Sequence, residues 1–253
     1  MTWEDLALYI HVNTHDGFLE ACKGVPLELI RECERGFGIA FPQLYVDFLM
    51  AMGADACGYP PMGRQYDHNF HVLLEHLGHP GYPAYQYFRV GYQVDDFDDG
   101  SGANIMEPCL DLTRAAEGDT PVVMIPGDMG FRPEYVDDFG RTLAEYLAWS
   151  ATLYFGLSRP RRKGLVADCE TPSALLLMRD QAIEVLGRLG LKLELSPSPR
   201  FTCVGNAELT ARVQSTRERE GALSIVLAGY DDRQVRHAVR TLIDEVPGFS
   251  DAW

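Results

Sequence analysis

The chain has 253 residues, of which 46% are hydrophobic, and a formal net charge of -15 at pH 7. This length can bury the core of one or two domains. No apolar run approaches the roughly 20 residues that a membrane-spanning helix needs. The negative charge also disfavours nucleic acid and anionic membranes as direct partners, because both would be repelled.

The first residues, MTWEDLALYIHV, are acidic and lack the basic start and apolar core of a signal peptide, so we expect a cytoplasmic protein. Six widely scattered cysteines form no C-x-x-C pair; they are Cys22, Cys33, Cys57, Cys109, Cys169 and Cys203. In a cytosolic chain this pattern is typical of reduced, mostly buried thiols. We expect no cofactor and no metal.

Residues 27–53, LELIRECERGFGIAFPQLYVDFLMAMG, predict two short amphipathic helices that meet at Phe41-Pro42. In the first helix Glu34 shares an apolar stripe with Leu27, Ile30 and Phe37, which is costly unless the carboxylate finds donors. We therefore expect Glu34 to accept backbone N–H bonds from the turn before Pro42. A catalytic Glu34 is the alternative, although no acid–base partner is spaced nearby.

Four of the seven histidines cluster as His68, His71, His76 and His79. They could be zinc ligands, but His71 and His76 would lie about 140 degrees apart on a helix, and an ordinary histidine-rich helix and turn is the simpler interpretation. The next segment places Tyr82, Tyr85 and Tyr87 beside two prolines. These tyrosines are either core residues or exposed interface anchors.

A dense acidic loop, DDFDDGSG, follows, with Asp95, Asp96, Asp98 and Asp99. It fails as an EF-hand because Phe97 and Met106 would occupy positions that need oxygen ligands. An irregular calcium site, a solvated turn and an anionic docking loop for a basic partner all remain open. Phe139, Leu143, Tyr146 and Leu147 then predict a helix capped by Asp137-Asp138.

We expect α+β architecture throughout: helices packed on a mainly antiparallel sheet over 1–158, a basic linker over 159–170, and a small α+β sandwich over 171–253. Thr171 and Asp231 or Asp232 can cap two helices. Strand candidates lie between them at 191–195, 201–204, 209–214 and 223–228. An additional strand at 165–167 would make this unit ferredoxin-like.

The charge is unevenly divided. Residues 1–160 contain 24 Asp plus Glu against 9 Lys plus Arg, whereas residues 161–253 contain 13 of each. The electric field of this net negative charge would steer a basic protein toward the first segment. The alternative is that the acidic surface only maintains solubility.

The first segment resembles the SUKH superfamily, which includes a yeast cell-wall-synthesis regulator and bacterial immunity proteins. Its opening signature is matched at Ile30, Glu34, Gly38, Phe41, Pro42, Tyr45, Phe48, Leu49 and Gly53, and its closing helix at Phe139, Leu143, Tyr146 and Leu147. The resemblance covers residues 20 to 155. It implies a SUKH-like fold for the N-terminal domain and says nothing about the remainder of the chain.

The resemblance implies an immunity protein that binds and neutralises a cognate bacterial toxin, such as a nuclease, by stoichiometric occlusion. From charge and residue type, we expect the contacts to include Asp95, Asp96, Asp98, Asp99, Tyr82, Tyr85 and Tyr87. A regulatory or scaffolding module that binds another protein is the alternative. A metal-dependent hydrolase is a third possibility, but the chain lacks known nucleophile, phosphate-loop and dinucleotide motifs, so we expect no enzyme.

Overall fold

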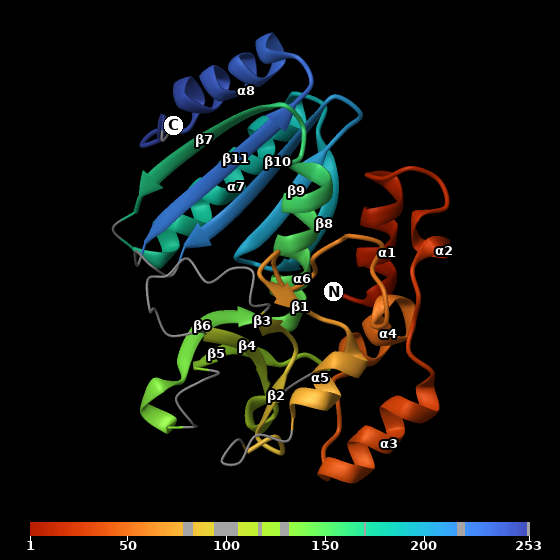
Figure 1. Cartoon of the computed structure of the whole chain (residues 1–253). Helices are drawn as coiled ribbons and strands as arrows, with labels where there is room; N and C mark the ends of the chain where they lie inside the picture. Colours follow the sequence, from red (N-terminus) through yellow and green to blue (C-terminus); the bar gives the residue numbers. More distant parts are fainter. Residues whose placement is uncertain are drawn as a thin grey trace, which may run out of the picture. The chain divides into compact units, whose positions relative to one another are not determined.

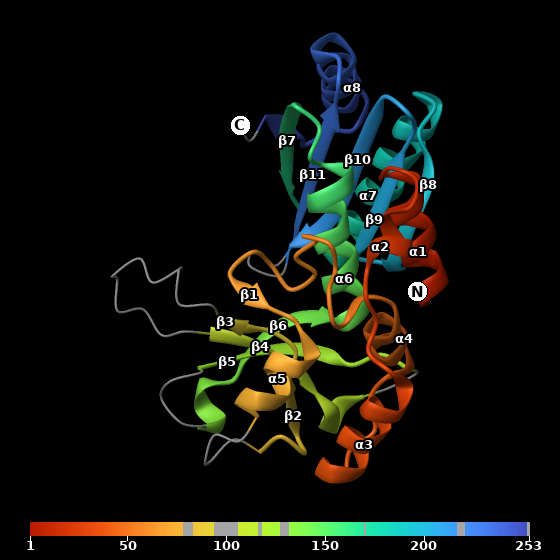
Figure 2. The ribbon, with the colours of Figure 1, turned by 45° about the vertical axis from the view of Figure 1, so that its right-hand side comes forward.

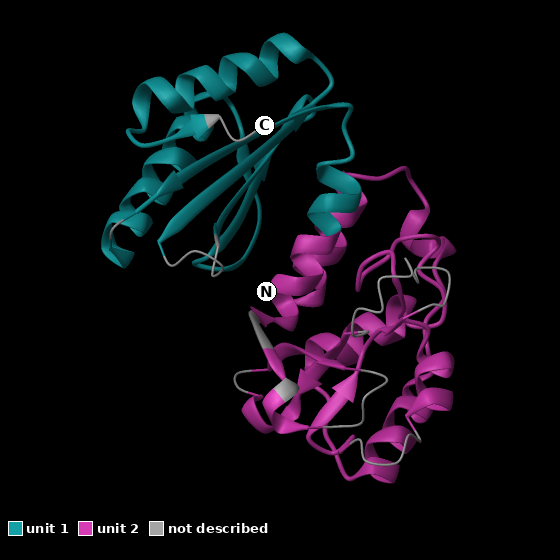
Figure 3. Ribbon diagram, turned by 60° about the vertical axis from the view of Figure 1, so that its left-hand side comes forward, with its two compact units in different colours: residues 1, 151–253 teal, residues 2–150 magenta. Residues whose placement is uncertain are grey.

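The computed structural model describes residues 1–77, 83–93, 106–115, 118–126, 132–169, 171–216 and 221–251. It has mixed α+β architecture with antiparallel sheets. The chain divides into two compact units, shown in Figure 3: the N-terminal unit, Thr2–Ser150, and the C-terminal unit, Ala151–Trp253 together with Met1. The division lies close to the boundary that we expect at residue 158.

The N-terminal unit combines helices with a four-stranded antiparallel sheet of order β2-β4-β5-β6 and a separate two-stranded sheet, β1-β3 (Figure 1). Its helices are α1 (Trp3–Val12), α2 (Phe18–Ala21), α3 (Leu27–Phe37), α4 (Gln43–Met52), α5 (Phe70–His76), α6 (Leu143–Ala151) and the short 3-10 helices η2 (Leu112–Arg114) and η3 (Pro133–Tyr135). Its strands are β1 (Tyr66–Asp67), β2 (Tyr87–Arg89), β3 (Tyr92–Gln93), β4 (Met106–Asp111), β5 (Pro121–Pro126) and β6 (Asp137–Thr142).

The corner between α3 and α4 is held by Glu34, as the sequence predicts. The Phe41 backbone N–H donates to Glu34 Oε1 at 2.8 Å, and Arg31 Nη1 lies 2.6 Å from Glu34 Oε2. The Glu34 residue is only 7% exposed. Gly38 ends α3 with a φ of 65°, a left-handed conformation that glycine adopts without strain. The carboxylate therefore satisfies a buried donor directly before Pro42 and fixes the turn between the helices.

Replacing Glu34 tests this hydrogen bond. We expect Glu34→Ala to destabilise the N-terminal unit by about 2–3 kcal/mol, because it leaves the Phe41 N–H buried without an acceptor and removes a charged partner of Arg31. Glu34→Gln retains an oxygen acceptor, so its loss should be clearly smaller. Urea denaturation of both variants measures the difference. Equal losses would contradict a specific role for this hydrogen bond.

Three aromatic residues of the opening signature, Phe41, Tyr45 and Phe48, belong to an aromatic core around this corner. Phe41 lies against Tyr45, Phe70 and Phe88, with ring centroids 5.2, 6.5 and 4.5 Å away, and Tyr45 stacks on Phe48 at 6.1 Å. All five rings are buried. Because aromatic side chains bury large apolar areas, this cluster joins α4, α5 and β2 into one core.

The predicted cap of the closing helix is wrong. Asp137 and Asp138 belong to β6 and pair with Met124 and Val123 of β5, so their backbone groups are used by the sheet. Helix α6 begins only at Leu143. Its start is marked by a reciprocal pair of contacts: the Glu145 N–H donates to Thr142 Oγ1 at 3.3 Å, and the Thr142 N–H to Glu145 Oε2 at 3.4 Å. This is a capping box, which the TLAE sequence encodes.

The C-terminal unit is a six-stranded antiparallel sheet with two helices on one face (Figures 1 and 2). The strand order is β12-β7-β11-β10-β9-β8. The elements are η4 (Thr152–Gly156), β7 (Arg161–Asp168), α7 (Pro172–Arg188), β8 (Lys192–Ser198), β9 (Phe201–Gly205), β10 (Leu209–Thr216), β11 (Ala222–Gly229), α8 (Asp232–Glu245) and β12 (Ser250–Asp251). Buried residues of both helices and of strands β7, β9, β10 and β11 form one hydrophobic cluster.

Both helices of this unit begin as predicted, with Thr171 and Asp231 accepting from the backbone N–H groups of Ala174 and Arg233. The four strand candidates are also confirmed. The basic linker expected over 159–170 is not, because residues 161–168 form β7 between β12 and β11. The order β12-β7-β11 follows a ferredoxin-like arrangement. However, a ferredoxin-like sheet has only four strands. Here β10 and β9 lie between β11 and β8, so the sheet of this unit is larger.

Candidate functional site

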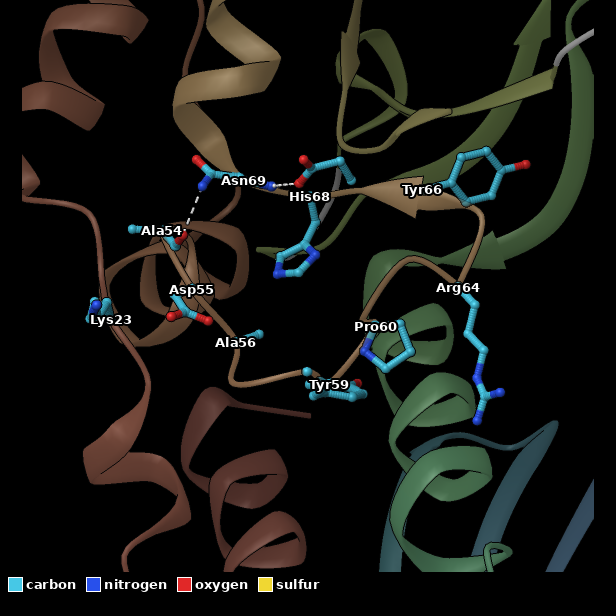
Figure 4. Close-up of a pocket in the computed structure, with 12 residues that line it drawn as sticks. Lys23, Ala54, Asp55, Ala56, Tyr59, Pro60, Arg64, Tyr66, His68 and Asn69 are labelled. Atoms are coloured by element: carbon cyan, nitrogen blue, oxygen red, sulfur yellow. Dashed lines mark hydrogen bonds between the residues drawn. The ribbon is translucent and has the colours of Figure 1, made fainter. Parts of the chain in front are cut away.

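The N-terminal unit contains a pocket of about 560 Å³ (Figure 4). Its wall comes from the segment between α2 and α3, from the loop between α4 and β1, and from β1 with the start of α5. The charged and polar side chains that line it are Lys23, Asp55, Arg64, Tyr66, Asp67, His68 and Asn69. Ala56, Tyr59 and Pro60 add apolar surface. Pockets of this volume and mixed lining are the usual places for ligands.

Backbone hydrogen bonds hold the two sides of the pocket together. The Lys23 N–H donates to the Asp55 carbonyl at 2.8 Å, and the Asp55 N–H donates back to the Lys23 carbonyl at 3.0 Å. Asn69 Nδ2 donates to the Ala54 carbonyl at 2.8 Å, while its Oδ1 accepts from the His71 N–H and caps α5. The pocket wall is thus built by contacts between segments distant in sequence.

Two carboxylates of the pocket use one oxygen each for local turns. Asp55 Oδ1 accepts from the Cys57 N–H at 2.9 Å, and Asp67 Oδ1 accepts from the Asn69 N–H at 2.8 Å. Cys57 itself has a φ of 51°, which is uncommon outside glycine. Within the described part of the chain, no ion pair joins Asp55 or Asp67 to a basic side chain. Both carboxylates therefore keep acceptor capacity for a ligand.

His68 is the histidine of the pocket lining. Burial lowers the pKa of His68 to about 4, although the neighbouring Asp67 and Asp55 carboxylates act in the opposite direction. Its Nε2 atom is buried without a hydrogen-bond partner among the described residues. In Figure 4 the imidazole points into the pocket on the side of Asp55 and Pro60. At neutral pH this ring is uncharged, so it does not neutralise either carboxylate.

The His68 pKa predicts an acid-dependent loss of stability. The unfolded chain binds a proton on this side chain near pH 6.5, whereas the folded protein does so only near pH 4. Between these values the unfolded state binds more protons, so stability falls as the pH is lowered. We expect the wild type to lose up to about 3 kcal/mol more than His68→Gln from pH 6.5 to pH 4. Urea unfolding at several pH values measures this difference.

A second histidine provides the matched control for this experiment. His71 is exposed on α5, so His71→Gln should leave the pH dependence of stability as in the wild type. Parallel curves for the wild type and His68→Gln would contradict the assignment to His68.

The acidic loop predicted from sequence, with Asp95, Asp96, Asp98 and Asp99, lies outside the described residues, as do Tyr82 and His79. Tyr85 is 62% exposed in the turn before β2. Tyr87 is half-buried on β2 and packs against the cluster of Cys109, Val123 and Ile125. Of the two described tyrosines, Tyr85 has the exposure of an interface anchor and Tyr87 the packing of a core residue.

Tyr66 connects the pocket to the described residues that flank the acidic loop in sequence. It pairs with Gln93 in the β1-β3 sheet, and its hydroxyl donates to the Met106 carbonyl at 2.7 Å. Gln93 and Met106 are the nearest described residues before and after the loop. Tyr66 therefore contacts one described residue that precedes the acidic loop in the sequence and one that follows it.

The other two described histidines of the predicted cluster, His71 and His76, lie in different environments. His71 is exposed, and His76 stacks on Tyr92 with ring centroids 3.9 Å apart. A search of the described residues finds no group of three or more His, Cys, Asp or Glu side chains that could hold a metal ion. All six cysteines are free, and Cys33, Cys109 and Cys203 are buried.

The comparisons with protein-family models, curated proteins and solved structures find no match to this chain. None of the described helices has the length and apolar character needed to cross a membrane. Sequence reasoning singled out His68 only as part of a histidine cluster and missed Lys23, Asp55, Arg64 and Asp67. These residues follow no spacing motif, and contacts between distant segments, such as the Lys23–Asp55 backbone pairing and the Asn69–Ala54 hydrogen bond, bring them together.

Proposed function

We propose that this chain is an immunity protein that binds a cognate bacterial toxin in a one-to-one complex and blocks it by occlusion. The observation that carries the proposal is the concentration of negative charge in one folded unit. The N-terminal unit contains 24 acidic and 8 basic residues, while the C-terminal unit contains 13 acidic and 14 basic residues. Such a field accelerates association with a basic protein surface.

The corner between α3 and α4 supports the same proposal. Its Glu34 carboxylate accepts the N–H of the residue before Pro42, and the signature aromatics Phe41, Tyr45 and Phe48 are buried in one aromatic core. These positions carry the resemblance to the SUKH superfamily. A scaffold stabilised in this way leaves its exposed surfaces available for a partner.

In the proposed mechanism, the acidic surface attracts the toxin and short-range contacts slow its release. Long-range attraction raises the association rate and is screened by salt. Buried aromatic and hydrogen-bonded contacts determine the dissociation rate. Neutralisation needs no chemical step, because covering the toxin's active site or substrate-binding surface is sufficient.

The proposal is tested with the neighbouring gene, which we expect to encode the toxin domain. We expect cells that express the toxin domain to survive when this chain is co-expressed, and the two proteins to co-purify in equal amounts. Survival without a complex would argue for an indirect regulatory role. Continued killing in the presence of soluble, folded chain would contradict the proposal.

The acidic loop has its own kinetic prediction. Changing Asp95, Asp96, Asp98 and Asp99 to asparagine should slow toxin association about tenfold at low salt and flatten its salt dependence. Stopped-flow mixing at several salt concentrations measures both. The control removes the same charge elsewhere, at the exposed residues Glu4, Glu20, Glu28 and Glu32. Equal slowing by both sets would assign the effect to overall charge, and unchanged kinetics would exclude the loop.

A further inference from the structure

The pocket contains unused hydrogen-bond acceptors. Asp55 and Asp67 each accept a hydrogen bond from a neighbouring backbone N–H on Oδ1, and their Oδ2 atoms have no hydrogen bond to any described residue. Both carboxylates lie close enough to His68 to act on its pKa, so the three side chains share one region of the pocket. A ligand with several N–H donors could donate hydrogen bonds to the free acceptor positions of both carboxylates.

The basic side chains that line the pocket do not form ion pairs with these two carboxylates. Lys23 lies directly opposite Asp55 in the backbone pairing, yet the two side chains form no ion pair. Figure 4 shows the Arg64 side chain extending away from His68. His68 is uncharged at neutral pH because burial lowers its pKa to about 4. Among the described residues, no cation is therefore paired with the two carboxylates of the pocket lining.

The pocket also suits a long side chain with an apolar stem. Its volume of about 560 Å³ exceeds that of one amino-acid side chain, and Ala56, Tyr59 and Pro60 supply apolar surface beside Asp55. Arginine buries its methylene groups against such surfaces while its planar guanidinium donates to carboxylates. The surrounding unit carries an excess of acidic residues, which favours a cation over an anion.

We propose that this pocket receives an arginine side chain of the partner protein, with Asp55 and Asp67 as acceptors of its guanidinium. This inference rests on the proposed function only for the source of the arginine. Lys23 lies opposite Asp55 in the backbone pairing, so its positive charge opposes a second cation beside Asp55. The pocket thereby selects for a particular residue on a basic toxin surface, in addition to the long-range attraction of the whole unit.

The test uses a small probe, so that it does not depend on the toxin. N-acetyl-arginine amide is titrated into the full chain and followed by the NMR signals of the backbone amides of Cys57, Gly58 and Asn69. We expect saturable shifts with a dissociation constant in the millimolar range. N-acetyl-citrulline amide, which has the same shape without the charge, should cause no shifts. Equal binding of citrulline, or binding only of N-acetyl-glutamate amide, would overturn the proposal, as would the absence of any shifts with the arginine probe.

Variants separate the pocket from general charge effects. Asp55→Asn with Asp67→Asn keeps the turn acceptors and should weaken probe binding about tenfold or more. Lys23→Met should strengthen it about twofold to threefold because a competing cation is removed. Glu28→Gln removes an exposed carboxylate from α3 and should have little effect. Weaker binding by Lys23→Met would indicate a zwitterionic ligand and overturn the assignment. Probe binding without protection against the toxin would reject the proposed function and retain the pocket.

Discussion

Replacing Arg89 with methionine should destabilise the N-terminal unit by about 3–5 kcal/mol, the largest loss that we expect from removing a single charge. Arg89 on β2 and Glu107 on β4 are each only 2% exposed, and Arg89 Nη2 lies 2.7 Å from Glu107 Oε2. Arg89 Nη1 also donates to the His76 carbonyl at 3.0 Å. Removing Arg89 leaves a buried carboxylate without its cation, and this desolvated charge is the source of the loss.

A double-mutant cycle distinguishes the pair from simple loss of packing. Arg89→Met combined with Glu107→Leu should be less destabilising than the sum of the two single changes. Each single change leaves one buried charge without its partner, whereas the double variant has neither charge. Arg236→Met serves as the control, since Arg236 and its partner Asp232 are both exposed, and loss of this pair should cost less than about 1 kcal/mol. Additive single losses in urea denaturation would contradict the account of the pair.

Gly24→Ala should cost about 3 kcal/mol or more and disturb the pocket wall. A Cβ atom at Gly24 would lie 1.6 Å from the Met50 carbonyl oxygen of α4. Neighbouring residues fix this approach: the Val25 N–H donates to the Leu49 carbonyl at 2.8 Å, and Lys23 pairs with Asp55. Because the clash is with backbone, no side-chain rotation can relieve it. Relief must separate the segment between α2 and α3 from α4.

The chain contains a matched glycine for comparison. Gly36 lies inside α3, and an added Cβ would meet no atom within 4 Å. Gly36→Ala should therefore stabilise the protein by about 0.5–1 kcal/mol, because alanine favours a helix and restricts the unfolded chain. Thermal unfolding of both variants measures the contrast. A stable Gly24→Ala protein with unchanged probe binding would show that this close approach is not required for the pocket.

Local sequence patterns predicted the parts of the fold that depend on neighbouring residues. The stripe of α3 and the Phe41-Pro42 pair predicted both helices and the Glu34 hydrogen bond, since the donor lies only seven positions away. Thr171 and Asp231 marked helix starts for the same reason. The Asp137-Asp138 cap was wrong because β5 competes for these backbone groups, and pairing with a distant strand leaves no local signal.

The pocket could not be predicted because its residues are separated in the sequence. Lys23 meets Asp55 only through backbone bonds between two loops. Asp67 ends a two-residue strand that is too short for a recognisable pattern, and His68 follows this strand. The Arg89–Glu107 pair likewise depends on the registry of β2 with β4. The basic residues 161–163 suggested a linker because they form the exposed start of β7, whose buried positions lie further along the strand.

The central claim is that the N-terminal unit captures a basic toxin by direct contact. Calorimetric titration of the full chain with a cognate toxin domain, which we expect the neighbouring gene to encode, tests it most directly at low and at high salt. We predict one-to-one binding whose affinity falls as salt is raised, and falls further when Asp55 and Asp67 are both changed to asparagine. The absence of binding to the folded toxin domain at low salt would contradict the account.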